Sequence, residues 1–195
     1  MPIQIGQRPD HGFDEPLGLL SDCHRRIEHF LHVLLAIHEQ AAGGSLTPGE
    51  RVDLDAAVTY FAAAAPKHIA DEEDSLFPRL RASGDTTAAR VLDLVARLER
   101  DHDAADQHHG VVDTLVRRWL AREHLEAGEA RELRERLTAL RVIYQSHIDV
   151  EDREVFPTAA RLLSASEICE MGREMAARRR PPAKTKSQSN QGIDT

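Results

Sequence analysis

Apolar side chains recur at spacings of three and four residues in four long segments of the chain. These segments cover about residues 15–40, 48–81, 85–124 and 129–163. In the first segment the repeating positions are Leu17, Leu20, His24, Ile27, Leu31, Leu34 and His38. This spacing places a stripe of side chains on one face of an α-helix. Four such helices joined by short loops predict an all-α fold, an antiparallel up-down four-helix bundle.

Capping residues mark where these helices begin. Thr47 and Glu50 match a capping box at the start of the second helix, and Asp85 is expected to cap the third. Ser164 and Glu167 match another capping box, which predicts a short C-terminal helix. A proline inside a helix removes a backbone donor and crowds the preceding turn, so it kinks or ends the helix. The prolines expected to do so are Pro66, Pro78 and Pro157.

These signals divide the chain into four parts. Residues 1–13 form an N-terminal arm, residues 14–165 the four-helix bundle, and residues 166–180 the short C-terminal helix. Residues 181–195 are polar, contain prolines and carry basic side chains, so we expect a flexible, disordered tail.

Composition excludes several classes of function. The 195 residues carry a formal net charge of -8, which argues against a nucleic-acid-binding body because phosphate neutralisation needs a basic face. No apolar run approaches the length of a membrane span, and no signal peptide is visible at the N-terminus. Cys23 and Cys169 match no cysteine-based motif, so we expect two reduced thiols and a cytoplasmic location.

The chain contains one polar phrase twice. "HIADEEDSLFP" occupies residues 68–78, and "HIDVEDREVFP" occupies residues 147–157. In each copy a histidine and a glutamate lie four positions apart, so one helix face presents both side chains together. Nearly the same number of residues separates His24 from His102 as separates the two phrases. The first two helices therefore resemble a hairpin that is duplicated as the last two.

Buried imidazoles and carboxylates are costly unless strong partners satisfy them. Metal cations are such partners, and a duplicated hairpin would present two similar half-sites, which favours a dinuclear centre over a mononuclear one. The alternative is a network of ion pairs without metal. Imidazole with carboxylate suits iron, manganese or zinc, so the donors alone leave the metal open.

The order of these residues resembles the hemerythrin-like (HHE cation-binding) domain family. The resemblance covers about residues 14–165, and the doubled His-Ile, Glu and Phe-Pro positions make it specific. It implies a non-haem centre of two iron ions, with an oxo or hydroxo bridge as an option, inside a four-helix bundle. Carried over to this chain, Glu72 and Glu151 would be bridging carboxylates. The full implied ligand set is His24, His68, Glu72, His102, His147 and Glu151.

One position departs from the family pattern. Oxygen-carrying hemerythrins place a second histidine four residues after the third-helix ligand, where this chain has Asp106. A further ligand could come from Asp106, Glu28, Glu73 or His109, and the sequence leaves this choice open. The departure argues against simple oxygen carriage and suits redox reactivity, sensing or iron transfer at least as well.

The resemblance therefore implies a di-iron protein that binds, senses or reacts with oxygen, nitric oxide or peroxide, or that donates iron. Such a role connects it with oxidative or nitrosative stress, and a sensor would need a protein partner that is not yet identified. A peroxide-consuming di-iron enzyme is the alternative, and an oxygen carrier or iron store is third. Whether the chain is an enzyme stays open. We expect Tyr144 to be a core residue with a satisfied hydroxyl, and a hydroxyl in the outer shell of the site is the alternative.

Overall fold

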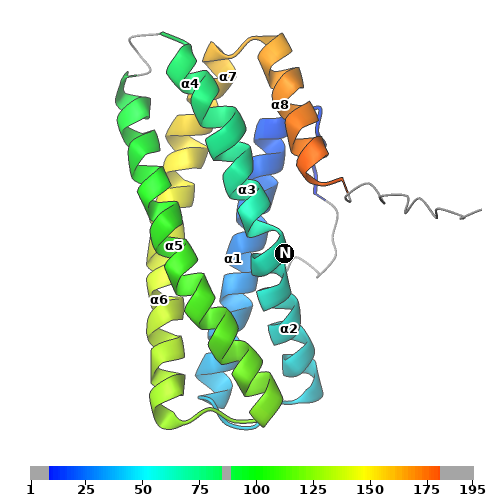
Figure 1. Cartoon of the computed structure of the whole chain (residues 1–195), viewed down its shortest axis with the longest axis vertical. Helices are drawn as coiled ribbons and strands as arrows, with labels where there is room; N and C mark the ends of the chain where they lie inside the picture. The colour runs from blue at the N-terminus through cyan, green and yellow to red at the C-terminus, as the bar shows by residue number, and fades with distance from the viewer. Residues whose placement is uncertain (1–8, 85–88, 181–195) are drawn as a thin grey trace, which may run out of the picture.

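The computed structural model describes residues 9–84 and 89–180, and within these ranges the chain is helical and contains no strand. Four helical rods lie lengthwise beside one another (Figure 1). The first is α1 (Pro16–Ala41), and the third is α5 (Ala89–Arg122). The second comprises α2 (Pro48–Ala63), α3 (Ala65–Asp71), the π-helix η1 (Glu72–Leu76) and α4 (Phe77–Ala82). The fourth comprises α6 (Ala127–Val150), the π-helix η3 (Glu151–Val155) and α7 (Phe156–Leu162).

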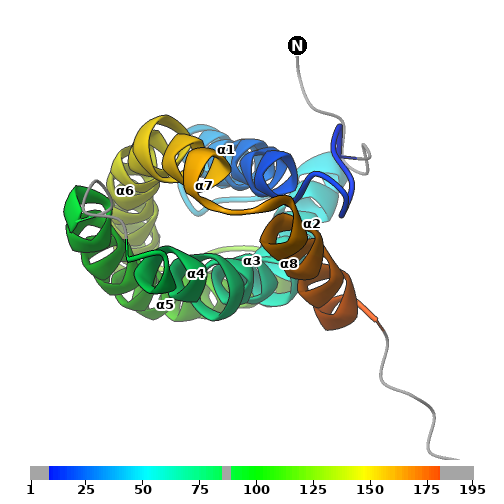
Figure 2. The same cartoon turned by 90° about the horizontal axis from the view of Figure 1, so that it is seen from above.

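The rods form a ring when the bundle is seen along its axis (Figure 2). Helix α1 contacts α2 and α6, and α5 contacts the same two neighbours. The α1–α2 and α5–α6 loops meet at one end, where the Leu125 N–H donates to the Gly43 carbonyl oxygen at 2.8 Å. Helix α8 (Ala165–Arg178) packs at the other end against α1, α3 and η1. The prediction of an all-α fold is confirmed.

The capping residues at Thr47 and Ser164 act as predicted. The Thr47 hydroxyl accepts from the backbone N–H of Glu50, and the Glu50 carboxylate accepts from the backbone N–H of Thr47. Ser164 and Glu167 form the same reciprocal pair at the start of α8. The predicted cap Asp85 and the predicted tail, residues 181–195, lie outside the described residues.

The second and fourth rods are interrupted, as their prolines predict, but the form of the interruption differs from a simple kink. The chain breaks at Ala64, two residues before Pro66. A π-helical turn precedes each of the other two prolines, Pro78 and Pro157. In these turns the N–H groups of Phe77 and Phe156 donate to the carbonyl oxygens of Glu72 and Glu151, respectively. A proline collides with the carbonyl four residues earlier, and a wider turn relieves that crowding. Each π-turn begins at a glutamate of the doubled phrase.

Two hydrophobic clusters enclose a polar layer. The larger cluster fills the loop end of the bundle around Trp119, Leu133 and Leu137, and the smaller one gathers Leu76, Phe77 and parts of α8. His24 illustrates the layer between them, because Leu20 before it belongs to the smaller cluster and Ile27 after it to the larger. The polar residues of the doubled phrase thus lie between the two hydrophobic clusters.

Candidate metal centre

The structure brings together all six residues that the sequence singled out. They form two overlapping groups, and within each group the candidate ligand atoms lie within 4.8 Å of one another. The first group is His24, His68, Glu72 and Glu151, and the second is Glu72, His102, His147 and Glu151. Each group has two imidazoles, and both groups share the same two carboxylates, whose exposed fraction is 0%. Each group could hold one cation, and the two shared carboxylates connect the groups.

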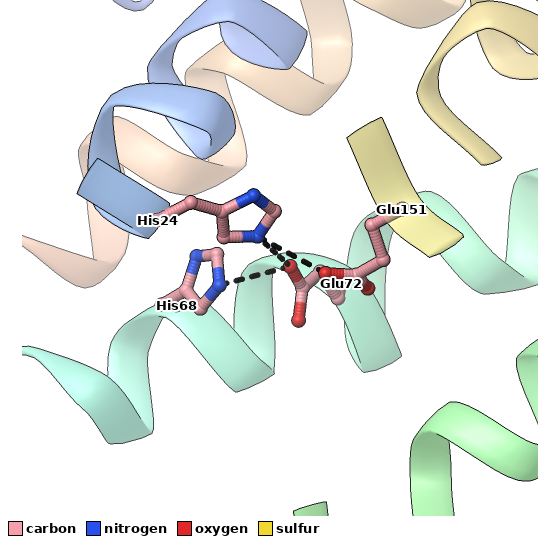
Figure 3. A group of neighbouring side chains, drawn as sticks. All are labelled: His24, His68, Glu72 and Glu151. Atoms are coloured by element: carbon pink, nitrogen blue, oxygen red, sulfur yellow. Dashed lines mark ion pairs between the residues drawn. The ribbon is translucent and has the colours of Figure 1, made fainter. Parts of the chain in front are cut away.

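In the first group both imidazoles turn their Nε2 atoms toward the shared carboxylates (Figure 3). His24 Nε2 lies 3.0 Å from an oxygen of Glu151 and 3.9 Å from one of Glu72. His68 Nε2 lies 3.1 Å from that same oxygen of Glu72. The first rod and the second therefore each supply one imidazole.

The second group repeats this arrangement. His102 Nε2 lies 3.3 Å from the other oxygen of Glu72, and His147 Nε2 lies 3.2 Å from Glu151. The Nε2 atoms of His102 and His147 are only 3.1 Å apart. Two imidazole nitrogens that face each other so closely can share one proton, or both can donate lone pairs to one cation.

Acidic residues hold three of the four imidazoles from outside. His24 Nδ1–H donates to Asp152 at 3.1 Å, and His102 Nδ1–H donates to Glu73 at 2.7 Å. An oxygen of Asp101 lies 3.8 Å from Nδ1 of His147. Metal-binding histidines commonly have such carboxylate partners, which fix the ring and leave Nε2 free for the ion. Nδ1 of His68 is buried and has no hydrogen-bond partner within the described ranges.

These contacts shift the proton affinities of the group. Burial opposes the charge of His147, but Glu151 and Asp101 raise its pKa to about 10. Burial likewise opposes the charge of His24, yet Asp152 and the two shared glutamates raise its pKa well above the usual range. Burial lowers the pKa of His68. Burial would raise the pKa of Glu72, but the surrounding histidines, foremost His68, hold it well below its usual range.

The donor atoms fit a bound cation. Both carboxylate oxygens of Glu72 and both of Glu151 are buried and make no well-aligned hydrogen bond among the described residues, although histidine nitrogens lie as near as 3.0 Å, and Nε2 of His24 is unsatisfied as well. Buried charges that lack donors are costly unless a cation compensates them. Donor atoms about 2.1 Å from one octahedral ion lie about 3.0 Å apart, close to the separations seen here. Imidazole and carboxylate donors suit iron, manganese and zinc.

The four additional candidates fall outside both groups. Glu73 reaches the centre only through the ring of His102. Glu28 and Asp106 are exposed, and Nε2 of His109 lies 2.8 Å from the hydroxyl oxygen of Tyr144. The sequence reasoning overlooked Asp152 and Asp101 as partners of the imidazoles. A signal was present, because each glutamate of the doubled phrase is followed directly by a second acid.

A small cavity adjoins the four imidazoles. Its volume is about 10 Å³, measured as the space open to the centre of a water molecule. About this much space holds one water molecule. The lining residues are His24, Ile27, Ala65, His68, Ile69, His102, Tyr144, His147 and Ile148. The cavity therefore has room for about one water-sized group beside the two groups.

None of the described helices combines the length and the apolar composition needed to cross a membrane. An uncharacterized protein of Haemophilus influenzae is 26% identical to this chain over 167 residues, which cover 86% of the chain and 91% of that relative. The family model of the hemerythrin HHE cation binding domain matches residues 15–159. That match spans most of the chain and all six residues of the two groups, so the chain belongs to the hemerythrin family of HHE cation-binding domains.

Proposed function

We propose that the chain holds two iron ions in the two groups and binds a small ligand such as oxygen, nitric oxide or peroxide beside them. One observation carries the proposal: two pairs of imidazoles share two fully buried carboxylates that make no well-aligned hydrogen bond among the described residues. Family membership supports a cation, and the donor set suits iron. The ring of helices with two loops at one end supports the predicted antiparallel four-helix bundle as the scaffold.

Bound iron would supply open coordination positions and reversible electron exchange with the small ligand. The protein's own residues prepare the site for this chemistry. Asp152 and Glu73 fix the rings of His24 and His102 through their Nδ1–H groups, so that Nε2 stays directed inward. The apolar side chains of Ile27, Ala65, Ile69 and Ile148 line the cavity and exclude bulk water from it.

The burial of the donors favours ligand binding or sensing over rapid iron donation. Each of the six side chains belongs to the buried part of the molecule, with exposed fractions of at most 5%. An ion at this depth can leave only when part of the bundle opens locally, whereas a diatomic molecule needs much less space. We therefore place the binding of small redox-active molecules first among the roles of this protein.

The test is anaerobic loading with ferrous iron, followed by metal analysis and by optical spectra after addition of oxygen, nitric oxide or peroxide. We expect about two irons per chain, as the two groups imply, and a spectral change with at least one of the ligands. Glu28→Gln is the matched control, since Glu28 is exposed on α1 and belongs to neither group. Catalytic loss of peroxide over many turnovers would instead identify an enzyme. Iron well below two per chain in the native protein would contradict the proposal.

A further inference from the structure

Tyr144 stands apart among the residues that line the small cavity. Four of the lining residues are the histidines of the two groups, and the remaining ones besides Tyr144 are isoleucine and alanine. Tyr144 therefore supplies the one polar side chain of this lining that belongs to neither group. Its exposed fraction is 7%, so the phenol group is enclosed by protein.

The hydroxyl of Tyr144 has a defined partner on α5. Nε2 of His109 lies 2.8 Å from the phenol oxygen. The imidazole of His109 packs on the ring of Phe61, with centroids 4.4 Å apart, and it borders a surface groove together with Asp106. Tyr144 and His109 thus connect the cavity beside the four histidines with the face between α2 and α5.

A tyrosine hydroxyl has one hydrogen to donate and can accept hydrogen bonds on its oxygen. Burial lowers the pKa of His109 to about 4, so its ring is neutral near pH 7 and carries one N–H. When that hydrogen is on Nε2, His109 donates to the phenol oxygen and leaves the Tyr144 O–H free for another acceptor. Burial also raises the pKa of Tyr144, which keeps the hydroxyl protonated as a donor.

We propose that Tyr144 donates a hydrogen bond to a small anionic or diatomic ligand in the cavity, and that His109 positions its hydroxyl for this contact. The inference rests on the proposed function, since it needs a ligand held beside the metal ions. An anionic ligand accepts hydrogen bonds strongly, and such a bond is worth more in a cavity shielded from water than in water. The pair would therefore set how tightly and how long the ligand is held.

The second tyrosine of the chain provides a matched control. Tyr60 is partly buried beside aromatic rings, but its hydroxyl donates to the backbone carbonyl oxygen of Cys23 at 3.4 Å, and it does not line the cavity. Tyr144→Phe and Tyr60→Phe each remove one tyrosine hydroxyl group. Only the first changes a residue that lines the cavity.

The experiment measures azide binding to the iron-loaded full chain by optical titration. We expect Tyr144→Phe to keep the iron content of the native protein and to weaken azide binding by about tenfold, the effect of losing one hydrogen bond to a charged group. Tyr60→Phe should change azide affinity less than twofold. His109→Ala should weaken azide binding, and His109→Gln should restore part of it because its amide can donate to the phenol oxygen.

A spectroscopic readout separates a hydrogen bond from altered packing. The infrared stretch of bound azide should shift between H₂O and D₂O in the native protein and in Tyr60→Phe, and this shift should be lost in Tyr144→Phe. Native azide affinity in Tyr144→Phe would overturn the inference, as would an absorption band from a tyrosinate bound directly to iron. If the native chain takes up no iron, the proposed function fails first. If iron binds normally and Tyr144→Phe changes nothing, only this inference fails.

Discussion

The two copies of the doubled phrase carry the same histidine and glutamate but lie in different surroundings. In the first copy Asp71, directly before Glu72, is fully buried and accepts hydrogen bonds from Arg178 at 3.0 Å and Arg179 at 2.6 Å. Both arginines belong to the C-terminal end of the chain's described part. The matching position of the second copy is Val150, which packs against the smaller hydrophobic cluster. The first π-turn is thus held by charges from α8, and the second by apolar packing.

A second difference concerns the imidazoles. Asp101, directly before His102, lies near Nδ1 of His147. The residue directly before His24 is Cys23, which offers no carboxylate, and Nδ1 of His68 has no hydrogen-bond partner in the described parts of the chain. The two groups have the same residue types, two histidines and the two shared glutamates, whereas their neighbours make the groups unequal. We therefore expect two metal positions with different affinities.

The largest effect should come from a carboxylate that both groups share. Glu72→Ala removes one donor from each group, so we expect the metal content to fall from about two ions per chain to well below one. Metal analysis after anaerobic loading and desalting measures this. Glu154→Gln is the control, because Glu154 lies in the second π-turn, pairs with Arg90 and is in neither group. Retention of both ions by Glu72→Ala would rule out a shared ligand.

The charged support of the first π-turn should make the next largest contribution. Replacing both Arg178 and Arg179 by alanine leaves the Asp71 carboxylate buried without these partners, and we expect the free energy of unfolding to fall by about 2 kcal/mol. The expected decrease in the free energy of unfolding is smaller than for a fully buried ion pair, because solvent reaches both arginines. Denaturant unfolding of the metal-free protein checks the value. Arg173→Ala, an exposed arginine of the same helix, should have little effect.

Because Asp101 lies beside His147 and, among the described residues, no carboxylate lies beside Nδ1 of His68, a change at Asp101 should weaken the binding of one metal ion more than that of the other. Asp101→Asn removes the carboxylate beside His147, and we expect about tenfold weaker binding of one of the two ions, the usual effect of losing an outer partner. A competitive metal titration with a chelator resolves the two steps. Asp103→Asn serves for comparison, since Asp103 is exposed on the same helix. If Asp101→Asn weakened the binding of both ions equally, the two groups would not differ in their dependence on Asp101.

Metal affinity should also rise with pH. The pKa of His147 is about 10 without metal, well above the value of about 6.5 in an unfolded chain, so this imidazole carries a proton at pH 7 that an ion must displace. Each displaced proton makes binding about tenfold tighter per pH unit between pH 7 and the raised pKa. The stability of the metal-free fold changes with pH in the opposite direction. Protonated His147 stabilises that fold, and this contribution is lost as the pH rises through about 10. Chelator competition at two pH values tests this, and an affinity that falls with pH would contradict it.

Local spacing predicted the helices, and the doubled phrase with the family resemblance singled out the six residues that the structure brings together. The sequence did not predict the π-turns, because His-x-x-x-Glu places both side chains on one face in an ordinary α-helix too. The outer partners Asp152 and Asp101 were overlooked, since an acid directly beside a buried polar residue is more often solvated. Glu73 was predicted as a possible ligand but contacts His102 instead. The contact of Asp71 with Arg178 joins residues 107 positions apart, and no local pattern reports such a contact. Tyr144 was predicted to be a core residue, and it is buried, with Nε2 of His109 2.8 Å from its hydroxyl oxygen.

The most direct test of the central claim is a magnetic measurement on the chain loaded with ⁵⁷Fe and then oxidised. Two ferric ions bridged by Glu72 and Glu151 should couple antiferromagnetically, so Mössbauer spectra in an applied field should show a diamagnetic pair that accounts for about two irons per chain. A single iron per chain, or two irons with the magnetic spectra of isolated high-spin ions, would contradict a shared centre.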